Sequence, residues 1–339
     1  MHSALLSKRG IIFYLTFFVL AISKLCATQE DLEHLQNNPI QTEKPWIISA
    51  DFLFWLASEE IASIWADVIT VGDNTSSWGV PSFDFKWNYG FRLGMGYNLP
   101  YDQWDTILCW TWFRTETTNS LFASSLSLLQ PEFFAAFLSG DYPNSMTCKW
   151  SLLLNMFDWE LGRNFWTSKR LSLRPFLGIK GGWINQSIDT DYNNFIINEQ
   201  ITQNSGTEHV KNNFWGIGPL GGINSKWKIY GFDSNFFDLF GDFSAAAMWG
   251  TWIRGDNYKN TLAKTSSINL NNSSLGELMF RGFMGMGWDI KSKRLHFAAK
   301  IGYEMQLWLD QLRLATFQLQ CLHNDLTLQG LTFNCRFDF

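Results

Sequence analysis

The stretch from Phe85 to Leu99 constrains the fold of this chain more than any other, because its side chains alternate strictly. Odd positions are large and apolar, and even positions are Lys, Asn, Gly or Arg. A β-strand places alternate side chains on opposite faces. The stretch therefore predicts a strand with one apolar face and one polar, glycine-rich face. It is far longer than the ordinary strand of about five or six residues, and it matches a tilted strand that crosses a bilayer, which needs roughly 9–11 residues.

The composition agrees with strands that face lipid on one side only. The chain has 339 residues with 18 Trp and 30 Phe, yet charged residues make up 17% and the mean hydropathy is -0.10. Beyond the N-terminus no apolar run reaches the roughly 20 residues of a membrane helix. The net charge of -5 gives no support for nucleic-acid binding, which usually needs a basic domain.

The N-terminus has the layout of a secretory signal peptide, with basic residues ahead of an apolar run at 11–22 and small residues after it. We expect cleavage after Ala27, with Ser23 as the alternative. A short membrane anchor would be too brief to span, and a lipid-modified Cys26 is disfavoured because Leu25, not a small residue, precedes it. The predicted organisation is a signal peptide at 1–27, a periplasmic lead-in at 28–45 and an outer-membrane β-barrel at 46–339.

Ten alternating segments are predicted as strands. They cover residues 46–56, 85–99, 104–116, 148–162, 171–187, 211–229, 239–254, 278–290, 295–309 and 325–339. The connections between them are alternately long and short, as in outer-membrane barrels with short periplasmic turns and long external loops. The fold class is therefore an all-β, transmembrane, antiparallel up-and-down barrel. Twelve strands would result if 119–146 or 188–210 hid a further hairpin, and residues 131–137 could form a short helix.

The last strand has apolar residues at its odd positions and ends in Phe339. We interpret it as the segment through which barrel-assembly machinery recognises the protein. The alternative is a strand that merely ends in Phe.

Motifs of catalysis are absent from the sequence, which contains no GxSxG, HExxH or P-loop pattern. Gly94 and Gly96, and the similar pair Gly285 and Gly287, lie inside predicted strands and so do not form a phosphate loop. As inward strand residues they leave space or allow close packing. His209 or His323 could serve an enzyme at the external rim, although each is more simply an ordinary loop histidine.

Charged residues on the inward faces are the candidate functional residues, because a charge facing lipid at midplane costs about 2–4 kcal/mol for Lys or Arg. The lumen-facing candidates are Lys86, Arg92, Arg114, Asp158, Glu160, Arg174, Lys180, Arg281, Lys300, Glu304 and Arg336, with Asp51, Glu277 and Asp338 on the same faces. They suit a water-filled channel. Alternatively they pair and plug the barrel, since eight strands are just filled by side chains and ten are close to that limit.

Four cysteines remain after the signal peptide, namely Cys109, Cys148, Cys321 and Cys335. They form no CxxC pair and have no histidine at zinc-ligand spacing. Export to an oxidising compartment allows disulfide bonds, and the three pairings of four cysteines remain open.

The chain resembles a known family. The segment Trp87–Asn98, followed by Trp104-Asp105 and Trp110–Phe113, carries most of the resemblance, with support from Trp46–Trp55 and Gly330–Phe339. These segments resemble the pore-forming, major-outer-membrane-protein-like β-barrels of Legionella and environmental chlamydiae. The resemblance covers nearly the whole mature chain. It implies pore-forming activity in an outer membrane, no cofactor and no catalytic residues. The cysteines of the mature chain are similar to those of chlamydial envelope proteins that are cross-linked by disulfides.

The expected function is therefore a porin-like protein of the bacterial outer membrane that passes small polar solutes or ions. A closed structural or adhesive barrel whose long loops bind a partner is the first alternative, and a barrel enzyme is the second. The expected partners are outer-membrane lipid and the assembly machinery, with a homo-oligomer or disulfide-linked envelope proteins as further options.

Overall fold

The computed structural model describes residues 45–339 apart from 60–64, 72–75, 80, 101, 125, 132–141, 198–199, 202–203, 233–234, 263–264, 292–294 and 314–322. The predicted signal peptide lies outside the described residues. So do nearly all of the predicted lead-in and all but the first residue of the helix predicted at 131–137.

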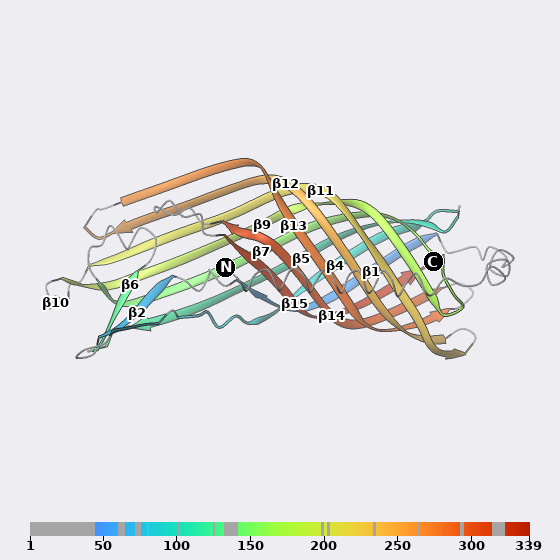
Figure 1. The fold of residues 1–339 in the computed structure, drawn as a ribbon, viewed down its shortest axis with the longest axis horizontal. Coiled ribbons are helices and arrows are strands. Elements are labelled where there is room, and N and C mark those ends of the chain that lie inside the picture. Colours follow the sequence, from blue (N-terminus) through green and yellow to red (C-terminus); the bar gives the residue numbers. More distant parts are fainter. Residues whose placement is uncertain are drawn as a thin grey trace, which may run out of the picture.

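Ten long strands form one closed antiparallel barrel (Figure 1). They are β1 (Trp46–Ser58), β4 (Trp87–Asn98), β5 (Trp104–Phe122), β7 (Tyr142–Arg163), β9 (Leu171–Ile197), β11 (Ser205–Phe232), β12 (Asn235–Asn260), β13 (Thr265–Lys291), β14 (His296–Arg313) and β15 (His323–Asp338). Closure comes from antiparallel pairing of β1 with β15. The predicted fold class is confirmed. Among the described residues, no helix is long and apolar enough to cross a membrane.

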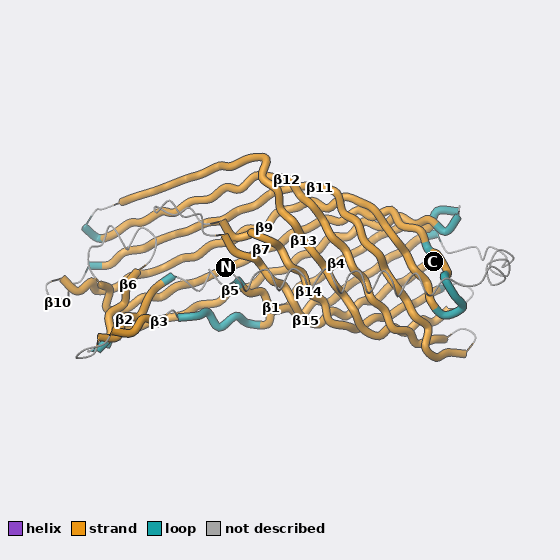
Figure 2. The backbone as a smooth tube through the Cα atoms, in the orientation of Figure 1, coloured by secondary structure: helices purple, strands orange, loops and turns teal. Residues whose placement is uncertain are grey.

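The end of the barrel that carries the short connections is called the turn end, and the opposite end the loop end. At the turn end the first and last strands meet, because the N–H of Trp46 donates to the carbonyl of Phe339 at 3.1 Å. At the loop end a separate three-stranded sheet of β2 (Ala66–Val71), β3 (Ser76–Gly79) and β6 (Ser127–Pro131) lies beside the barrel wall (Figure 2). Two short strands, β8 (Phe165–Trp166) and β10 (Gln200–Ile201), pair with β9.

The strands continue much further toward the loop end than the sequence predicted. The segments 188–210 and 255–275, expected to be loops, are mostly strand, and β9, β11, β12 and β13 have 27, 28, 26 and 27 residues. Their Asn- and Ser-rich composition suggested loops, but a strand whose outer face lies in water beyond the membrane can be polar. The described residues form no further pair of barrel strands, so the twelve-strand alternative is wrong.

The outward face shows where the membrane lies. On β13 the outward side chains from Leu278 to Trp288 are apolar and exposed, and beyond Gly276 they become polar, as at Asn269 and Ser267. Aromatic residues mark two levels around the barrel. Trp46, Trp227 and Trp288 are exposed near the turn end, and Trp87, Trp215 and Trp249 near the opposite boundary. An apolar band between aromatic girdles is the lipid-facing surface of an outer-membrane barrel.

The Phe85–Leu99 stretch follows the predicted alternation only from Trp87 onward. Tyr89 is 69% exposed on the outside, whereas Gly90 is buried on the inside. A Cβ at Gly90 would lie 2.6 Å from the carbonyl oxygen of Trp112, so this glycine allows close packing rather than leaving open space. Phe85 precedes β4 and turns inward, with its ring centroid 5.3 Å from that of Trp150. The prediction of a lipid-facing Phe85 was wrong, because the regular strand begins two residues later.

Candidate functional site

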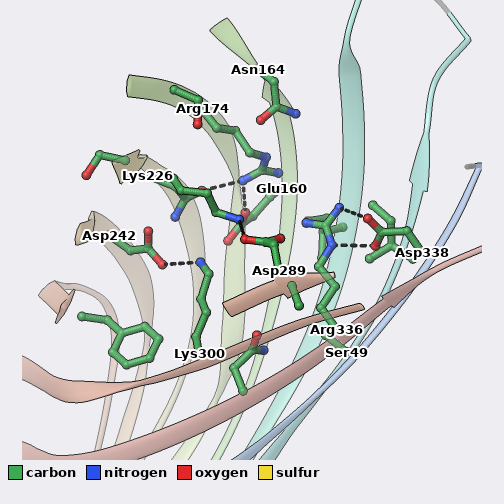
Figure 3. A pocket seen from close by; sticks show the side chains of 18 of the residues that line it. Ser49, Glu160, Asn164, Arg174, Lys226, Asp242, Asp289, Lys300, Arg336 and Asp338 are labelled. Atoms are coloured by element: carbon green, nitrogen blue, oxygen red, sulfur yellow. Dashed lines mark hydrogen bonds and ion pairs between the residues drawn. The ribbon is translucent and has the colours of Figure 1, made fainter. Parts of the chain in front are cut away.

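A charged cavity of about 690 Å³ occupies the turn end of the barrel interior. Its walls come from most of the barrel strands, and its outer rim includes Trp166, Lys228 and Phe236. Figure 3 shows the side chains of Arg174, Lys226, Lys300 and others pointing into this space from different strands. Strand alternation explains their convergence, since every second residue of a barrel strand points inward.

Each cationic group of the cavity wall shown in Figure 3 lies beside a carboxylate. Arg174 contacts Asp105 at 2.5 Å and Glu160 at 2.9 Å. The remaining contacts in this set are Lys226 with Asp289 at 2.7 Å, Arg336 with Asp338 at 2.7 Å and Lys300 with Asp242 at 3.6 Å. The cavity is therefore polar, but its fixed charges largely compensate one another.

Deeper in the barrel, a buried ion-pair network forms the floor of the cavity. The guanidinium of Arg92 bridges Asp51 at 2.7 Å and Glu304 at 2.8 Å, and Arg281 contacts the same Glu304 at 2.6 Å. Glu304 is fully buried. Beside this network Lys180 contacts Asp158 at 2.6 Å. Buried charges persist only when paired and hydrogen-bonded, and this network meets that condition.

Above the floor, toward the loop end, large apolar side chains fill the barrel. We call this set the apolar layer. Its members are at most 1% exposed and come from nine of the ten barrel strands: Leu53, Trp55, Phe113, Trp150, Leu152, Leu154, Ile184, Phe214, Met248, Trp252, Met279, Trp308 and Leu328. Arg92 lies 5.8 Å from the ring of Trp55, so the floor and the layer are in contact. In this structure the interior is closed, as expected for a barrel only two strands larger than the filled eight-stranded case.

The structure places nine of the eleven lumen-facing candidates inside the barrel. Arg92, Asp158, Glu160, Arg174, Arg281, Lys300 and Arg336 line the cavity, and Lys180 and Glu304 are buried in adjoining ion pairs. Of the further residues, Asp51 and Asp338 line the cavity, and Glu277 is buried on the loop-end side.

The prediction was wrong for Lys86 and Arg114, which do not face the lumen. Lys86 is exposed ahead of β4, where the alternation has not yet begun. Arg114 lies on the outer face of β5, 62% exposed, with its guanidinium 3.7 Å from Glu116. Its neighbours Phe113 and Thr115 point inward instead. This part of β5 lies beyond the lipid-facing band, so a charge on the outer face meets water rather than lipid.

Sequence reasoning missed several cavity residues and the whole apolar layer. Lys226 and Asp242 follow the same alternation as the predicted residues and could have been found by extending it through β11 and β12. The sequence indicated the apolar layer less clearly than it indicated these cavity residues. Leu53 and Trp55 share a face with Ser49 and Asp51, which shows that this face changes from polar to apolar toward the loop end.

The described cysteines are not bonded to one another. Cys109 and Cys335 are partly buried, and Cys148 is fully buried among the apolar side chains. Cys321 lies outside the described residues.

His209 lies on the outer wall beside Asp189, with its Nδ1 directed at an Asp189 carboxylate oxygen. The Ser187 hydroxyl donates to the same carboxylate at 2.9 Å. A serine nucleophile would instead need a hydrogen bond to the histidine that takes its proton. His323 is exposed at the start of β15.

A closed ten-stranded barrel with an outward apolar band and aromatic girdles is an integral outer-membrane protein. The family described as Legionella pneumophila major outer membrane protein precursor matches residues 37–339. The chain therefore belongs to the Legionella major outer membrane protein family, as the resemblance predicted, and it resides in the bacterial outer membrane. No curated protein matches it.

Solved structures with a similar fold are outer-membrane barrels of varied function. The outer membrane protease OmpT from Escherichia coli is 8% identical with a TM-score of 0.37, covering 89% of this chain and 98% of its own. The Pseudomonas putida toluene transporter TodX is 9% identical with a TM-score of 0.31, covering 90% and 92%. Ail, the attachment invasion locus protein of Yersinia pestis, is 10% identical with a TM-score of 0.23, covering 87% and 99%.

Proposed function

We propose that this protein is a pore for small polar solutes or ions, and that the state described here is its closed state. The observation that supports the proposal is the charged cavity, which extends from the turn end to the ion-pair floor. A barrel with a purely structural interior could continue its apolar packing through this half, at no cost for burying charges. Membership of a major outer membrane protein family is consistent with such a role.

Conduction requires the apolar layer to move, because its side chains leave no space for water. Apolar constrictions in channels gate by excluding water. The open pore would be narrow, since ten strands enclose far less space than the 16–18 strands of general porins. Compensated wall charges predict weak ion selectivity, which a small reversal potential under a salt gradient would verify.

Single-channel recording in planar bilayers tests the proposal. We compare the wild type with Trp55→Ala and Trp252→Ala, two truncations within the apolar layer. Each is expected to conduct more frequently than the wild type, because it removes an aromatic ring that fills the barrel. A buried Trp→Ala change costs about 3–5 kcal/mol, so folding is checked by heat-modifiable migration on gels. If the wild type and both folded variants are silent, the pore proposal fails.

A closed adhesive barrel is the second candidate, and the free edge of β13 favours it. Residues 265–275 pair with β12, whereas pairing with β14 begins only at Leu278. Among the described residues this leaves one side of an uncharged strand unpaired outside the membrane, and exposed edges can accept a strand from a partner. Absence of conductance in every bilayer experiment, together with binding of external peptides by the wild type that is lost in the Ser267→Lys variant, would favour the adhesive function.

We also propose that the protein is not an enzyme. Family membership supports this, and the Ser187, Asp189 and His209 group lacks the hydrogen bond from serine to histidine.

A further inference from the structure

Two carboxyl groups lie buried on the loop-end side of the apolar layer. Glu59 follows the last residue of β1, and Glu277 lies on β13 at the upper edge of the lipid-facing band; each is 1% exposed. Oε1 of Glu59 accepts a hydrogen bond from Gln186 at 2.9 Å, whereas its Oε2 has no partner among the described residues. Neither carboxylate oxygen of Glu277 accepts a hydrogen bond from any described residue.

The groups around these carboxyls do not neutralise them. Near Glu277 the charged groups are Arg313 and Asp310 of β14, Asp325 of β15 and Glu59 itself, so three of the four are acidic. The guanidinium of Arg313 donates instead to the backbone carbonyls of Asp310 and Gly276, both at 3.0 Å.

Among the described residues, the side chain that donates a hydrogen bond to Glu59 is that of Gln186, which is neutral. Gln186 also donates to Oε1 of Gln311 at 2.5 Å, and the Gln311 carbonyl accepts from the indole N–H of Trp252 at 3.3 Å. This chain of contacts connects the Glu59 carboxyl to the apolar layer through Trp252.

An ionised carboxylate in such a position is unstable, because burial without a cation or water costs several kcal/mol. The group binds a proton instead, and burial raises the pKa of Glu59 to about 8. The closed state therefore contains a neutral Glu59 at neutral pH. Loss of the proton creates a charge that only incoming water or a cation can solvate, and water can reach it only if the packing around it loosens.

We propose that Glu59 and Glu277 form a proton-operated latch on the apolar layer, which is packed while both carboxyls are neutral and admits water when they ionise. The inference rests on the proposed pore function and specifies how that pore is regulated. The direction of the pH response follows from the raised affinity of the closed state for protons. Protons favour closure, and a rise in pH toward about 8 favours opening.

The test is single-channel recording of the wild type between about pH 5 and about pH 9, a range that covers most of the interval between the ordinary pKa of a carboxyl and the raised one, and extends above it. If one proton is released on opening, we expect the ratio of open to closed channels to rise by up to about tenfold per pH unit below the raised pKa and to level off above it. Glu59→Gln and Glu277→Gln keep the shape of the neutral group and remove its titration. Each should therefore weaken the response to pH, and the double variant should remain closed throughout.

Glu116→Gln is the matched control, because Glu116 is an exposed glutamate of the outer wall paired with Lys149 at 2.9 Å. It should keep the wild-type response. Intrinsic fluorescence gives a second readout, since hydration of the layer tryptophans at high pH should shift their emission to the red in the wild type and not in the double variant.

The outcomes separate the latch from the pore. Channels whose opening is independent of pH, or whose response survives in the double variant, would overturn the latch and leave the pore intact. A silent wild type at every pH, together with conducting Trp55→Ala, would also overturn the latch alone. Silence in all of these proteins would overturn the pore function itself.

Discussion

At the scale of single residues, the barrel interior depends on how its charges are paired. Arg92 is the central residue of the floor, since its guanidinium contacts two carboxylates from two other strands. Burying ions is costly, and removal of one partner leaves the other charge buried and uncompensated. The floor therefore holds together three distant segments of the chain only while all of its members are present.

Arg92→Met is expected to destabilise the folded barrel by about 3–5 kcal/mol, the usual cost of breaking a buried ion pair. Urea unfolding in lipid vesicles, followed by tryptophan fluorescence, measures this change. Arg114→Met is the matched control, because Arg114 is exposed and makes only a loose contact with Glu116. Equal stability of the two variants would contradict a structural role for the floor.

At the scale of an element, one strand changes its surroundings along its length. β13 faces lipid with Met284 and Met286, but faces water with Asn269 and Ser267 further toward the loop end. The same alternation of inward and outward residues thus meets two solvents, which explains why a strand of 27 residues combines an apolar half with a polar half.

Met284→Arg should destabilise the barrel by about 2–4 kcal/mol, the cost of an arginine on the lipid face near midplane. Ser267→Arg, on the same strand beyond the band, should leave stability unchanged. The free energy of unfolding in vesicles measures both variants. A similar loss in the two would mean that the lipid boundary has been placed wrongly.

At the scale of the whole molecule, the barrel must enter the outer membrane as one closed unit, because an open sheet edge in lipid leaves backbone groups without partners. The last strand provides this closure by pairing with β1. We propose that the assembly machinery recognises this strand through its terminal Phe339, which is exposed on the lipid side of the turn end. Oligomeric state and disulfide linkage to other envelope proteins stay predictions.

Phe339→Ala is expected to lower the amount of folded protein in the outer membrane, measured by fractionation and heat-modifiable migration. Phe333→Ala serves as control, since Phe333 is a similarly exposed aromatic residue on the same strand. Recognition of the terminus would be refuted by normal assembly of Phe339→Ala, or by an equal defect in both variants.

The sequence by itself determined the barrel, its lipid-facing surface and most of its inward charges. These properties are local, because a two-residue period fixes which face each side chain occupies once a strand forms. Alternation was misleading at Phe85 and Lys86, where the strand had not begun, and at Arg114, where the outer face meets water. Only the tertiary structure decided that the interior is closed. The apolar layer, the Arg92 floor and the burial of Glu59 and Glu277 each join residues from strands far apart in the sequence, and no local period reports which of those side chains meet across the barrel.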